Sequence, residues 1–326
     1  MSENLNFVKN IPPHILKRLT SINLEVPSVN CDKAINELLQ KSVLLGGKRL
    51  RPLLTYVFGD FFGVELEKLD IAAKSIEMVH AASLAHDDVI DEATIRRDAP
   101  SINIQSTNKK AILAGDFLLA AVIGDLSRFG NLELVREMAV VIELLAQGEW
   151  LQSDLVLSRA YTRENIREIA LKKTSSVMSW CSVSAAICAG FNKELVNYAR
   201  EFGHHLGIAF QLLDDTLDFS GESRKDALLD LKNGQVNSVL FEWLELNQKV
   251  KSDFLKGVDI TNQFNENRLD EALALVQKMA EEHLNECRQI VSLLKKELTD
   301  KRPEKQLEKS CKTLMFIIDY LAKRTY

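Results

Sequence analysis

Two short segments of the sequence repeat the same arrangement of aspartates, LAHDDVID at 84–91 and QLLDDTLD at 211–218. In each segment the first and last aspartates are four residues apart, which places their carboxylates on one face of a helix with Cβ atoms about 5–6 Å apart. Three acids this close, among apolar neighbours, repel one another and are costly to leave unpaired in the interior. A divalent cation would balance their charge. The first aspartate group is Asp87, Asp88 and Asp91, and the second is Asp214, Asp215 and Asp218.

Magnesium suits such groups because it prefers oxygen ligands, is commonly held by one or two carboxylates, and completes its coordination with water and phosphate oxygens. Two groups facing each other would therefore clamp a diphosphate through shared metal ions. A single copy of the pattern is more often only a solvated acidic helix face. The second copy, which also lies among apolar residues, reverses that preference and favours a metal site.

Basic residues that could bind phosphate directly occur at separate places. The segment 46–52, GGKRLRP, combines two glycines with three cations just before a helix, where backbone N–H groups and cations favour a bound phosphate. Arg96 and Arg97 follow the first aspartate group by one or two turns, so we expect the helix to place them near the mouth of the same site. His80 lies seven residues before Asp87, on the same helix face. It could donate a hydrogen bond to phosphate, or it could be an ordinary core histidine.

The elements that must position these residues are helices. Apolar residues recur at helical spacing along nearly the whole chain, runs that alternate with period two are absent, and only 14 Gly and 6 Pro interrupt 326 residues. We therefore expect an all-α protein. Because no Gly/Ser-rich or Pro-rich linker divides the chain, we expect a single domain over 1–326. The predicted helices cover about 12–22, 32–44, 51–62, 67–94, 108–128, 131–158, 162–189, 192–219, 235–256, 266–299 and 303–325.

The composition excludes several classes of protein. With 46% hydrophobic residues the chain can bury a large core, and 41 Lys and Arg against 46 Asp and Glu give a net charge of -5, which does not favour nucleic-acid binding. Five scattered cysteines without CxxC spacing and an N-terminus without a recognisable export signal predict a cytoplasmic protein. The uncharged stretch 174–192 contains five serines. We interpret it as a buried helix and expect no stable membrane insertion.

Taken in order, these motifs resemble the trans-type polyprenyl diphosphate synthases over essentially the whole chain. The matching segments are GGKRLRP at 46–52, IEMVHAASLAHDDVIDEATIRRDAP at 76–100, Gly115-Asp116, QGE at 147–149, Lys173-Thr174 and FQLLDDTLDF at 210–219. The resemblance implies an all-α bundle of antiparallel helices around a deep central cavity, usually as a homodimer. It also implies the reaction: an allylic diphosphate ionises, isopentenyl diphosphate attacks the allylic cation, and a proton is lost to the released pyrophosphate.

The same resemblance implies roles for individual residues. Asp87, Asp91 and Asp214 would bind Mg²⁺, about three ions in each site. Supporting or water-mediated metal contacts would come from Asp88, Asp215 and Asp218. The allylic diphosphate would contact Arg96, Lys173, Thr174, Gln211 and Lys225, and the Lys173 carbonyl and the Gln211 side chain would also stabilise the cation. The isopentenyl diphosphate pocket would be formed by Lys48, Arg51, His80 and Arg97.

The sequence departs from the family after the second aspartate group. Relatives usually continue with a Gly-Lys pair and then DL..G..T.P, whereas this chain has Arg224-Lys225 in place of that pair. Asn237 and Val239 stand where Thr and Pro are common. The conformation of this shorter connection is therefore not predicted by the resemblance.

The residues one turn before Asp87 predict the length of the product. Ala82 and Ser83 share a helix face with Asp87 and point down the cavity. In short-chain relatives one or both of these residues are aromatic and form its floor, and Val79 is a further candidate for the floor. Two small residues leave the cavity open, so helix rise and open depth predict a long all-trans product of about C30–C50.

Other interpretations explain fewer of these residues. A farnesyl or geranylgeranyl diphosphate synthase would share the motifs and differ in product length. A non-catalytic subunit of a heteromeric synthase typically loses aspartates that this chain keeps. A metal phosphohydrolase, suggested by His80 and the His86-Asp87 pair, gives the second aspartate group no role. A terpene cyclase or head-to-head synthase would not need GGKRLRP for a second diphosphate.

Overall fold

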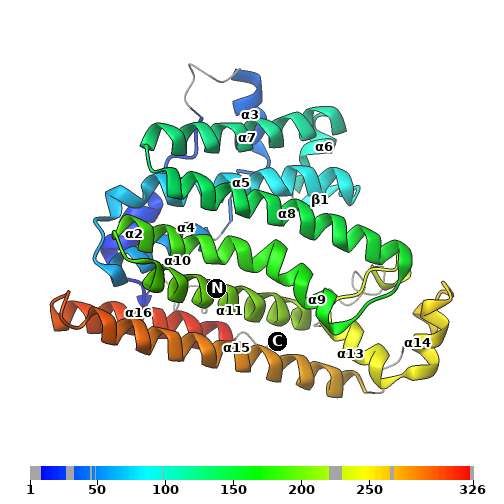
Figure 1. Ribbon diagram of the computed structural model, residues 1–326. Coiled ribbons are helices and arrows are strands. Elements are labelled where there is room, and N and C mark those ends of the chain that lie inside the picture. The colour runs from blue at the N-terminus through cyan, green and yellow to red at the C-terminus, as the bar shows by residue number, and fades with distance from the viewer. Residues whose placement is uncertain are drawn as a thin grey trace. The chain divides into compact units, whose positions relative to one another are not determined.

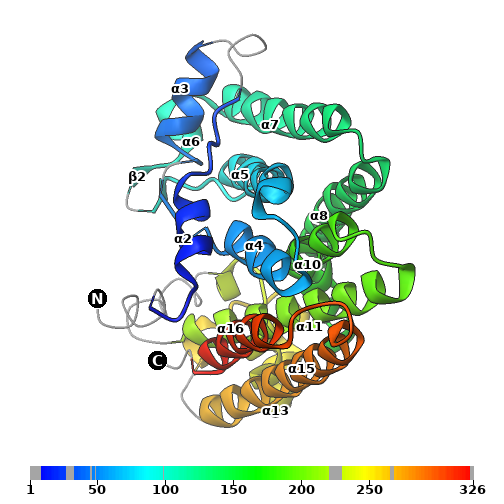
Figure 2. The same ribbon diagram turned by 90° about the vertical axis from the view of Figure 1, so that its left-hand side faces the viewer.

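The computed structural model describes residues 9–26, 33–44, 46–47, 49–97, 99–219, 230–264 and 268–323, and nearly all of its elements are helices (Figures 1 and 2). The prediction of an all-α protein is confirmed. In the described part of the chain the only paired strands are the two-residue strands β1 (Ile95–Arg96) and β2 (Ala99–Pro100). Lys48 and Lys225, both predicted to contact substrate, lie outside the described residues.

The helices follow the predicted order with changed ends. Their bounds are α2 Pro13–Thr20, α3 Lys33–Lys41, α4 Leu50–Phe62, α5 Asp70–Ile90, α6 Ile102–Gln105, α7 Asn108–Phe129, α8 Leu132–Ser158, α9 Arg163–Ala170, α10 Ser176–Cys188, α11 Lys193–Leu217, α13 Ser238–Leu246, α14 Gln248–Leu255, α15 Leu269–Leu298 and α16 Glu304–Ala322. Short 3-10 helices cover Leu66–Leu69 and Thr261–Gln263, and Leu171–Ser175 forms a π-helical turn.

Contacts divide the described residues into two compact units, each made of two separate segments. The first unit takes its residues from 1–142 and 180–196, and the second from 143–179 and 197–326. The boundaries fall inside α8, α10 and α11, so the chain passes from one unit to the other within continuous helices. The prediction of a single domain over 1–326 stays a prediction.

In the first unit, α5 packs along α7 and α4 and lies between them in Figure 2. Ala72, Ile76 and Val79 recur at helical spacing on the face of α5 that packs into the core, and none of them is exposed to solvent. Full burial of an aliphatic side chain such as Ile76 contributes about 1.5–3 kcal/mol. This packing fixes the helix that carries the first aspartate group.

In the second unit, two glycines bring α11 unusually close to the preceding helical segment. A Cβ on Gly203 would lie 2.2 Å from Cα of Ser179, and a Cβ on Gly207 would lie 2.3 Å from Cα of Ser175. Only glycine permits this approach. It sets the helix of the second aspartate group directly against the π-helical turn, while α15 packs on α13 and α16 in the same unit (Figure 1).

Three predicted helices are interrupted. The helix predicted over 67–94 ends at Ile90, because Glu92 adopts a left-handed conformation with φ 51° and the chain turns into the hairpin. The helix predicted over 235–256 breaks at Asn247, and the one predicted over 162–189 contains the π-helical turn. The uncharged stretch forms the buried helix that we predicted, and among the described residues no helix is long and apolar enough to cross a membrane.

Candidate functional site

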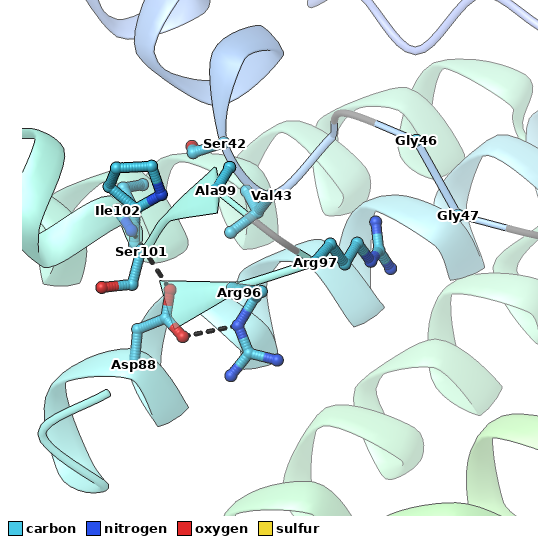
Figure 3. Close-up of a pocket in the computed structure, with 11 residues that line it drawn as sticks. Ser42, Val43, Gly46, Gly47, Asp88, Arg96, Arg97, Ala99, Ser101 and Ile102 are labelled. Carbon is cyan, nitrogen blue, oxygen red and sulfur yellow. Dashed lines mark hydrogen bonds and ion pairs between the residues drawn. The ribbon is translucent and has the colours of Figure 1, made fainter. Parts of the chain in front are cut away.

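The first aspartate group lies at the carboxyl end of α5. Asp87 is half-buried and Asp91 is exposed, whereas Asp88 is completely buried. The Oδ1 atom of Asp88 accepts a hydrogen bond from Nε of Arg96 at 2.5 Å, and its Oδ2 atom accepts the backbone N–H of Ile102 at 3.2 Å (Figure 3). Asp88 therefore anchors the segment that follows α5, and the more accessible members, Asp87 and Asp91, are the better candidates for metal ligands.

The two arginines that follow this group lie in a short hairpin, which directs their side chains to different places. β1 and β2 pair Ile95 with Pro100 and Arg96 with Ala99, and Arg97 in the turn has a φ of 53°. Both arginines lie beyond the end of α5 at Ile90, so the hairpin sets the direction of their side chains. The hairpin directs Arg96 to Asp88, while the guanidinium of Arg97 points away toward Gly47 (Figure 3).

Gly47 is required where the chain meets Arg97. Its φ is 83°, and a Cβ added to Gly47 would lie 3.1 Å from Nη1 of Arg97. A cavity of ≈510 Å³ is lined by residues 42–43 and 46–47 on one side and by the hairpin with the residues after it on the other, and both arginines line it (Figure 3). This volume falls in the range of small-ligand pockets. Its two guanidinium groups suit an anion such as a diphosphate.

Arg51 and His80 meet in the same unit around a buried acid that sequence reasoning missed. Burial raises the pKa of Glu77, and the positive charges of Arg51 and Arg97 oppose that shift. Burial and the same two arginines lower the pKa of His80 well below its ordinary value, so the imidazole is neutral at pH 7. Neutral His80 can still donate one hydrogen bond to phosphate. The only sequence signal for Glu77 is its place three residues before His80, on the same face of α5.

The second aspartate group lies at the end of α11 and is built like the first. Asp215, its second member, is buried: Oδ1 accepts Nε2–H of Gln211 at 2.8 Å, and Oδ2 accepts the backbone N–H of Ser238 at 2.9 Å. Burial raises the pKa of Asp215, and these hydrogen bonds oppose the shift. Asp214 is half-buried and Asp218 is exposed. In both groups the second aspartate therefore holds the start of a following helix, and the outer two remain more accessible.

Asp218 carries a strongly perturbed carboxyl. Partial burial and the neighbouring charges of Asp215 and Asp214 raise its pKa to about 6, and a hydrogen bond from Asn237 opposes the rise. Crowded carboxylates of this kind are stabilised in their ionised form by a bound cation.

Lys173 and Thr174 lie in the π-helical turn, a feature that often marks functional sites. Thr174 donates its hydroxyl hydrogen to Oε1 of Gln211 at 2.7 Å, so Gln211 links Thr174 to the second aspartate group. The Lys173 ammonium pairs with Glu149 and donates to Oε1 of Gln152 at 3.0 Å. The sequence singled out QGE at 147–149 without a role, and the structure shows that Glu149 of this motif orients Lys173.

Residues 32–276 match the family model described as Polyprenyl synthetase. The chain belongs to this family. It is 32% identical to a decaprenyl-diphosphate synthase of Dictyostelium discoideum over 89% of this chain and 66% of that protein. A prenyl transferase of Synechocystis sp. is 33% identical over 72% of each chain. The chain spans about two thirds of the Dictyostelium protein and about half of the mitochondrial solanesyl-diphosphate synthase 1 of rice.

Solved structures of polyprenyl synthetases share the fold. A decaprenyl diphosphate synthase from Rhodobacter capsulatus aligns with a TM-score of 0.77 at 25% identity, over 98% of this chain and 99% of that one. A polyprenyl synthase from Caulobacter crescentus, solved in complex with calcium and isoprenyl diphosphate, aligns with a TM-score of 0.76 at 23% identity over 98% of both chains.

The chemistry of the aspartates in this polyprenyl synthetase suits a divalent cation that takes some of its ligands from water and phosphate. In the described residues no three His, Cys, Asp or Glu side chains are arranged to hold a metal ion on their own. Mg²⁺ needs no such cluster when one or two carboxylates are joined by water and phosphate oxygens. The accessible outer aspartates and the crowded Asp218 carboxyl match that chemistry.

The residues predicted to set product length lie on α5 as expected. Val79 and Ala82 are completely buried, and Ser83 is half-buried with its hydroxyl donating to the carbonyl of His80 at 2.9 Å. Their role in product length stays a prediction.

Proposed function

We propose that this polyprenyl synthetase is a Mg²⁺-dependent prenyltransferase that condenses isopentenyl diphosphate with an allylic diphosphate into a long-chain all-trans polyprenyl diphosphate. One observation carries the proposal. In each aspartate group the second carboxylate is buried and accepts a backbone N–H, whereas the first and last carboxylates, four residues apart, are more accessible and have the spacing that suits bridging metal ions. The names of the relatives, decaprenyl-diphosphate synthase and prenyl transferase, support the same reaction.

The allylic diphosphate is assigned to the aspartates and the cations near them. Bound Mg²⁺ would neutralise the diphosphate and stabilise the pyrophosphate as it leaves. Asp87, Asp91, Asp214 and Asp218 would supply the carboxylate ligands. Arg96 and Lys173 would bind the phosphate oxygens, since each already lies in a network that holds its charged group in place. Thr174 and Gln211, whose side chains are hydrogen-bonded to each other, would complete this set.

Isopentenyl diphosphate is assigned to the basic cluster of the first unit. Arg97 and the backbone of Gly47 line the cavity of ≈510 Å³, and Arg51 faces the same buried Glu77 as Arg97 does. His80 would donate a hydrogen bond without adding charge, because burial keeps it neutral. The second substrate would thus contact Arg97, Arg51 and His80, next to Arg96 and Asp88, which line the same cavity.

We further propose a product of about C30–C50. The residues at 82 and 83 are small, so they would not block the growing chain, and the length is inferred from the helix rise over the depth that stays open. Relatives with comparable identity are named decaprenyl, solanesyl and octaprenyl diphosphate synthases. A farnesyl or geranylgeranyl product is the alternative that product analysis would reveal. The composition and scattered cysteines support a cytoplasmic location.

A homodimer is the proposed assembly. Several large apolar side chains of α7 and of the first half of α8 are exposed, and a subunit interface would cover them. They are Ile112, Leu113, Phe129, Leu132 and Val140, with exposures between 43% and 60%. The molar mass of the full chain in solution tests this assembly directly.

The test of the function is incubation of the full chain with farnesyl diphosphate, labelled isopentenyl diphosphate and Mg²⁺, followed by chromatography of the products. The expected result is release of pyrophosphate together with labelled prenyl diphosphates of C30 or longer. A labelled product no longer than C20 would correct the chain length alone. Absence of any labelled condensation product, with folded protein and Mg²⁺ present, would refute the proposed reaction.

A further inference from the structure

Asn237 lies at the junction between the second aspartate group and α13, and both ends of its amide are used. Its Oδ1 atom accepts the backbone N–H of Leu240 at 3.0 Å, which makes Asn237 the N-cap of α13. Its Nδ2 atom donates a hydrogen bond to Oδ2 of Asp218 at 3.2 Å. An N-cap needs only an acceptor. The contact with Asp218 is therefore a second function of the same side chain.

The start of α13 thus holds two members of the aspartate group at once. The backbone N–H of Ser238 binds the buried Asp215, and the neighbouring Asn237 side chain binds the exposed Asp218. One oxygen of Asp218 accepts from a neutral donor. The Asp218 side chain is exposed, so a cation from solvent can reach its carboxylate.

We propose that Asn237 is a positioning residue for metal binding: it orients the Asp218 carboxylate, through its amide N–H, for a divalent cation bound together with a diphosphate. This inference rests on the proposed function, in which Asp218 is a metal ligand. A neutral amide suits this position because Lys or Arg would pair with Asp218 and compete with the metal. Threonine, common here in the family, could cap the helix, but its hydroxyl is one bond nearer the backbone than the Asn237 amide nitrogen.

Matched substitutions distinguish the role of Asn237 as a helix cap from its role in positioning Asp218. Asn237→Ser keeps an effective N-cap oxygen but has no group that extends as far as the amide nitrogen. The matched control is Asn192→Ser, because Asn192 makes the same kind of cap contact at the start of α11, accepting the N–H of Leu195 at 3.0 Å. Asn237→Gly serves as a second variant, since glycine is also tolerated at N-caps.

The measurement is the rise in Tm of the full chain as Mg²⁺ is titrated in the presence of inorganic pyrophosphate, without turnover. For Asn237→Ser we expect the Mg²⁺ concentration at half of the maximal shift to rise about fivefold or more, since a hydrogen bond to a charged group is lost. The metal-free Tm should stay close to that of the unaltered protein. Asn192→Ser should keep the original Mg²⁺ midpoint.

Two results would overturn the inference. If the unaltered protein responds to Mg²⁺ with pyrophosphate and both Asn237 variants keep its midpoint, Asn237 is only a helix cap and the proposed function stands. If the unaltered protein neither responds nor forms a condensation product, the proposed function fails and the inference fails with it.

Discussion

The backbone N–H of Ser238 donates to the buried carboxylate of Asp215 at 2.9 Å, so the first residue of α13 is tied to the aspartate group at the end of α11. Asp88 makes the corresponding contact with Ile102 at the start of α6. The second aspartate of each group is thus a buried structural anchor, whereas the outer aspartates are more accessible to solvent. We therefore expect Asp→Asn to affect stability differently at the second aspartate of a group and at the outer ones.

Replacing Asp215 by Asn should cost stability. An amide has only one acceptor atom, whereas Asp215 accepts from both Gln211 and Ser238, so one of these buried donors loses its partner. We expect the free energy of unfolding to fall by about 1–3 kcal/mol. The matched substitution Asp218→Asn should not lower it, because burial and the neighbouring carboxylates raise the pKa of Asp218 to about 6 and make its charge unfavourable in the folded state. Denaturant unfolding measures both, and equal losses would show that Asp215 is not an anchor.

Replacing Gly47 by Ala should weaken binding of isopentenyl diphosphate. The new Cβ would lie 3.1 Å from Nη1 of Arg97 and push its guanidinium away, and the residue would also be strained at φ 83°. Gly46→Ala is the control, because Gly46 has φ 70° but no atom within 4 Å of an added Cβ. We expect both variants to lose roughly 1 kcal/mol of stability. Only Gly47→Ala should raise the KM for isopentenyl diphosphate, and an equal rise in both would contradict the contact with Arg97.

Gly115 provides space for His86 where α7 meets α5. A Cβ on Gly115 would lie 2.2 Å from Nε2 of His86, so Gly115→Ala should destabilise the protein by about 1–3 kcal/mol. The same change at Gly124, also within α7, meets only the end of Arg128 at 3.4 Å and should be neutral or stabilise by up to about 1 kcal/mol. In a His86→Ala background the loss at Gly115 should largely disappear. Additive effects in this double-mutant cycle would show that the two residues do not interact.

A pair of histidines predicts how stability changes with pH. Nδ1 of His205 and Nδ1 of His283 lie 2.8 Å apart, and burial, His205 and Arg167 lower the pKa of His283 to about 4. Because its folded pKa lies below the unfolded value of about 6.5, the unfolded state binds the proton more readily between these values. The stability contributed by neutral His283 is therefore complete above about pH 6.5 and is lost as the pH falls toward 4.

His283→Gln should remove the contribution of His283 to this dependence and leave that of His205, whose pKa is also lowered by burial. Since the His283 side chain is only half-buried, solvent screening limits the loss between pH 6.5 and 4 to about 1–2 kcal/mol. Unfolding curves at several pH values measure the slope for the variant and the unaltered protein. Identical slopes in this range would show that His283 does not have a lowered pKa.

The sequence predicted the helices and the aspartates better than it predicted what surrounds them. Helical periodicity follows from local chemistry, so the all-α class and the helix that carries Asp87 could be inferred. The left-handed conformations of Glu92 and Arg97, which end α5 and form the hairpin, occur at residue types that rarely adopt them. The local sequence therefore did not indicate that the side chains of Arg96 and Arg97 would point in different directions.

The sequence also did not predict which aspartates are buried or which distant residues contact them. The two members of each adjacent aspartate pair are the same residue type, and only the approach of Ile102 or Ser238 from the following segment distinguishes Asp88 and Asp215 from their neighbours. The partner of Lys173, Glu149, lies 24 residues away on α8. Contacts of this kind depend on tertiary packing, which spacing along the chain does not encode.

The most direct test of the proposed function is the rate of pyrophosphate release from farnesyl diphosphate and isopentenyl diphosphate in Asp87→Asn, Asp214→Asn and the double variant, with Mg²⁺ titrated and with excess chelator. If both aspartate groups serve one metal-assisted ionisation, each single variant should be slowed about 100-fold or more, the double variant should lose far less than the product of the two factors, and chelator should abolish turnover. Full turnover in excess chelator, or an unaltered rate in either single variant, would contradict it.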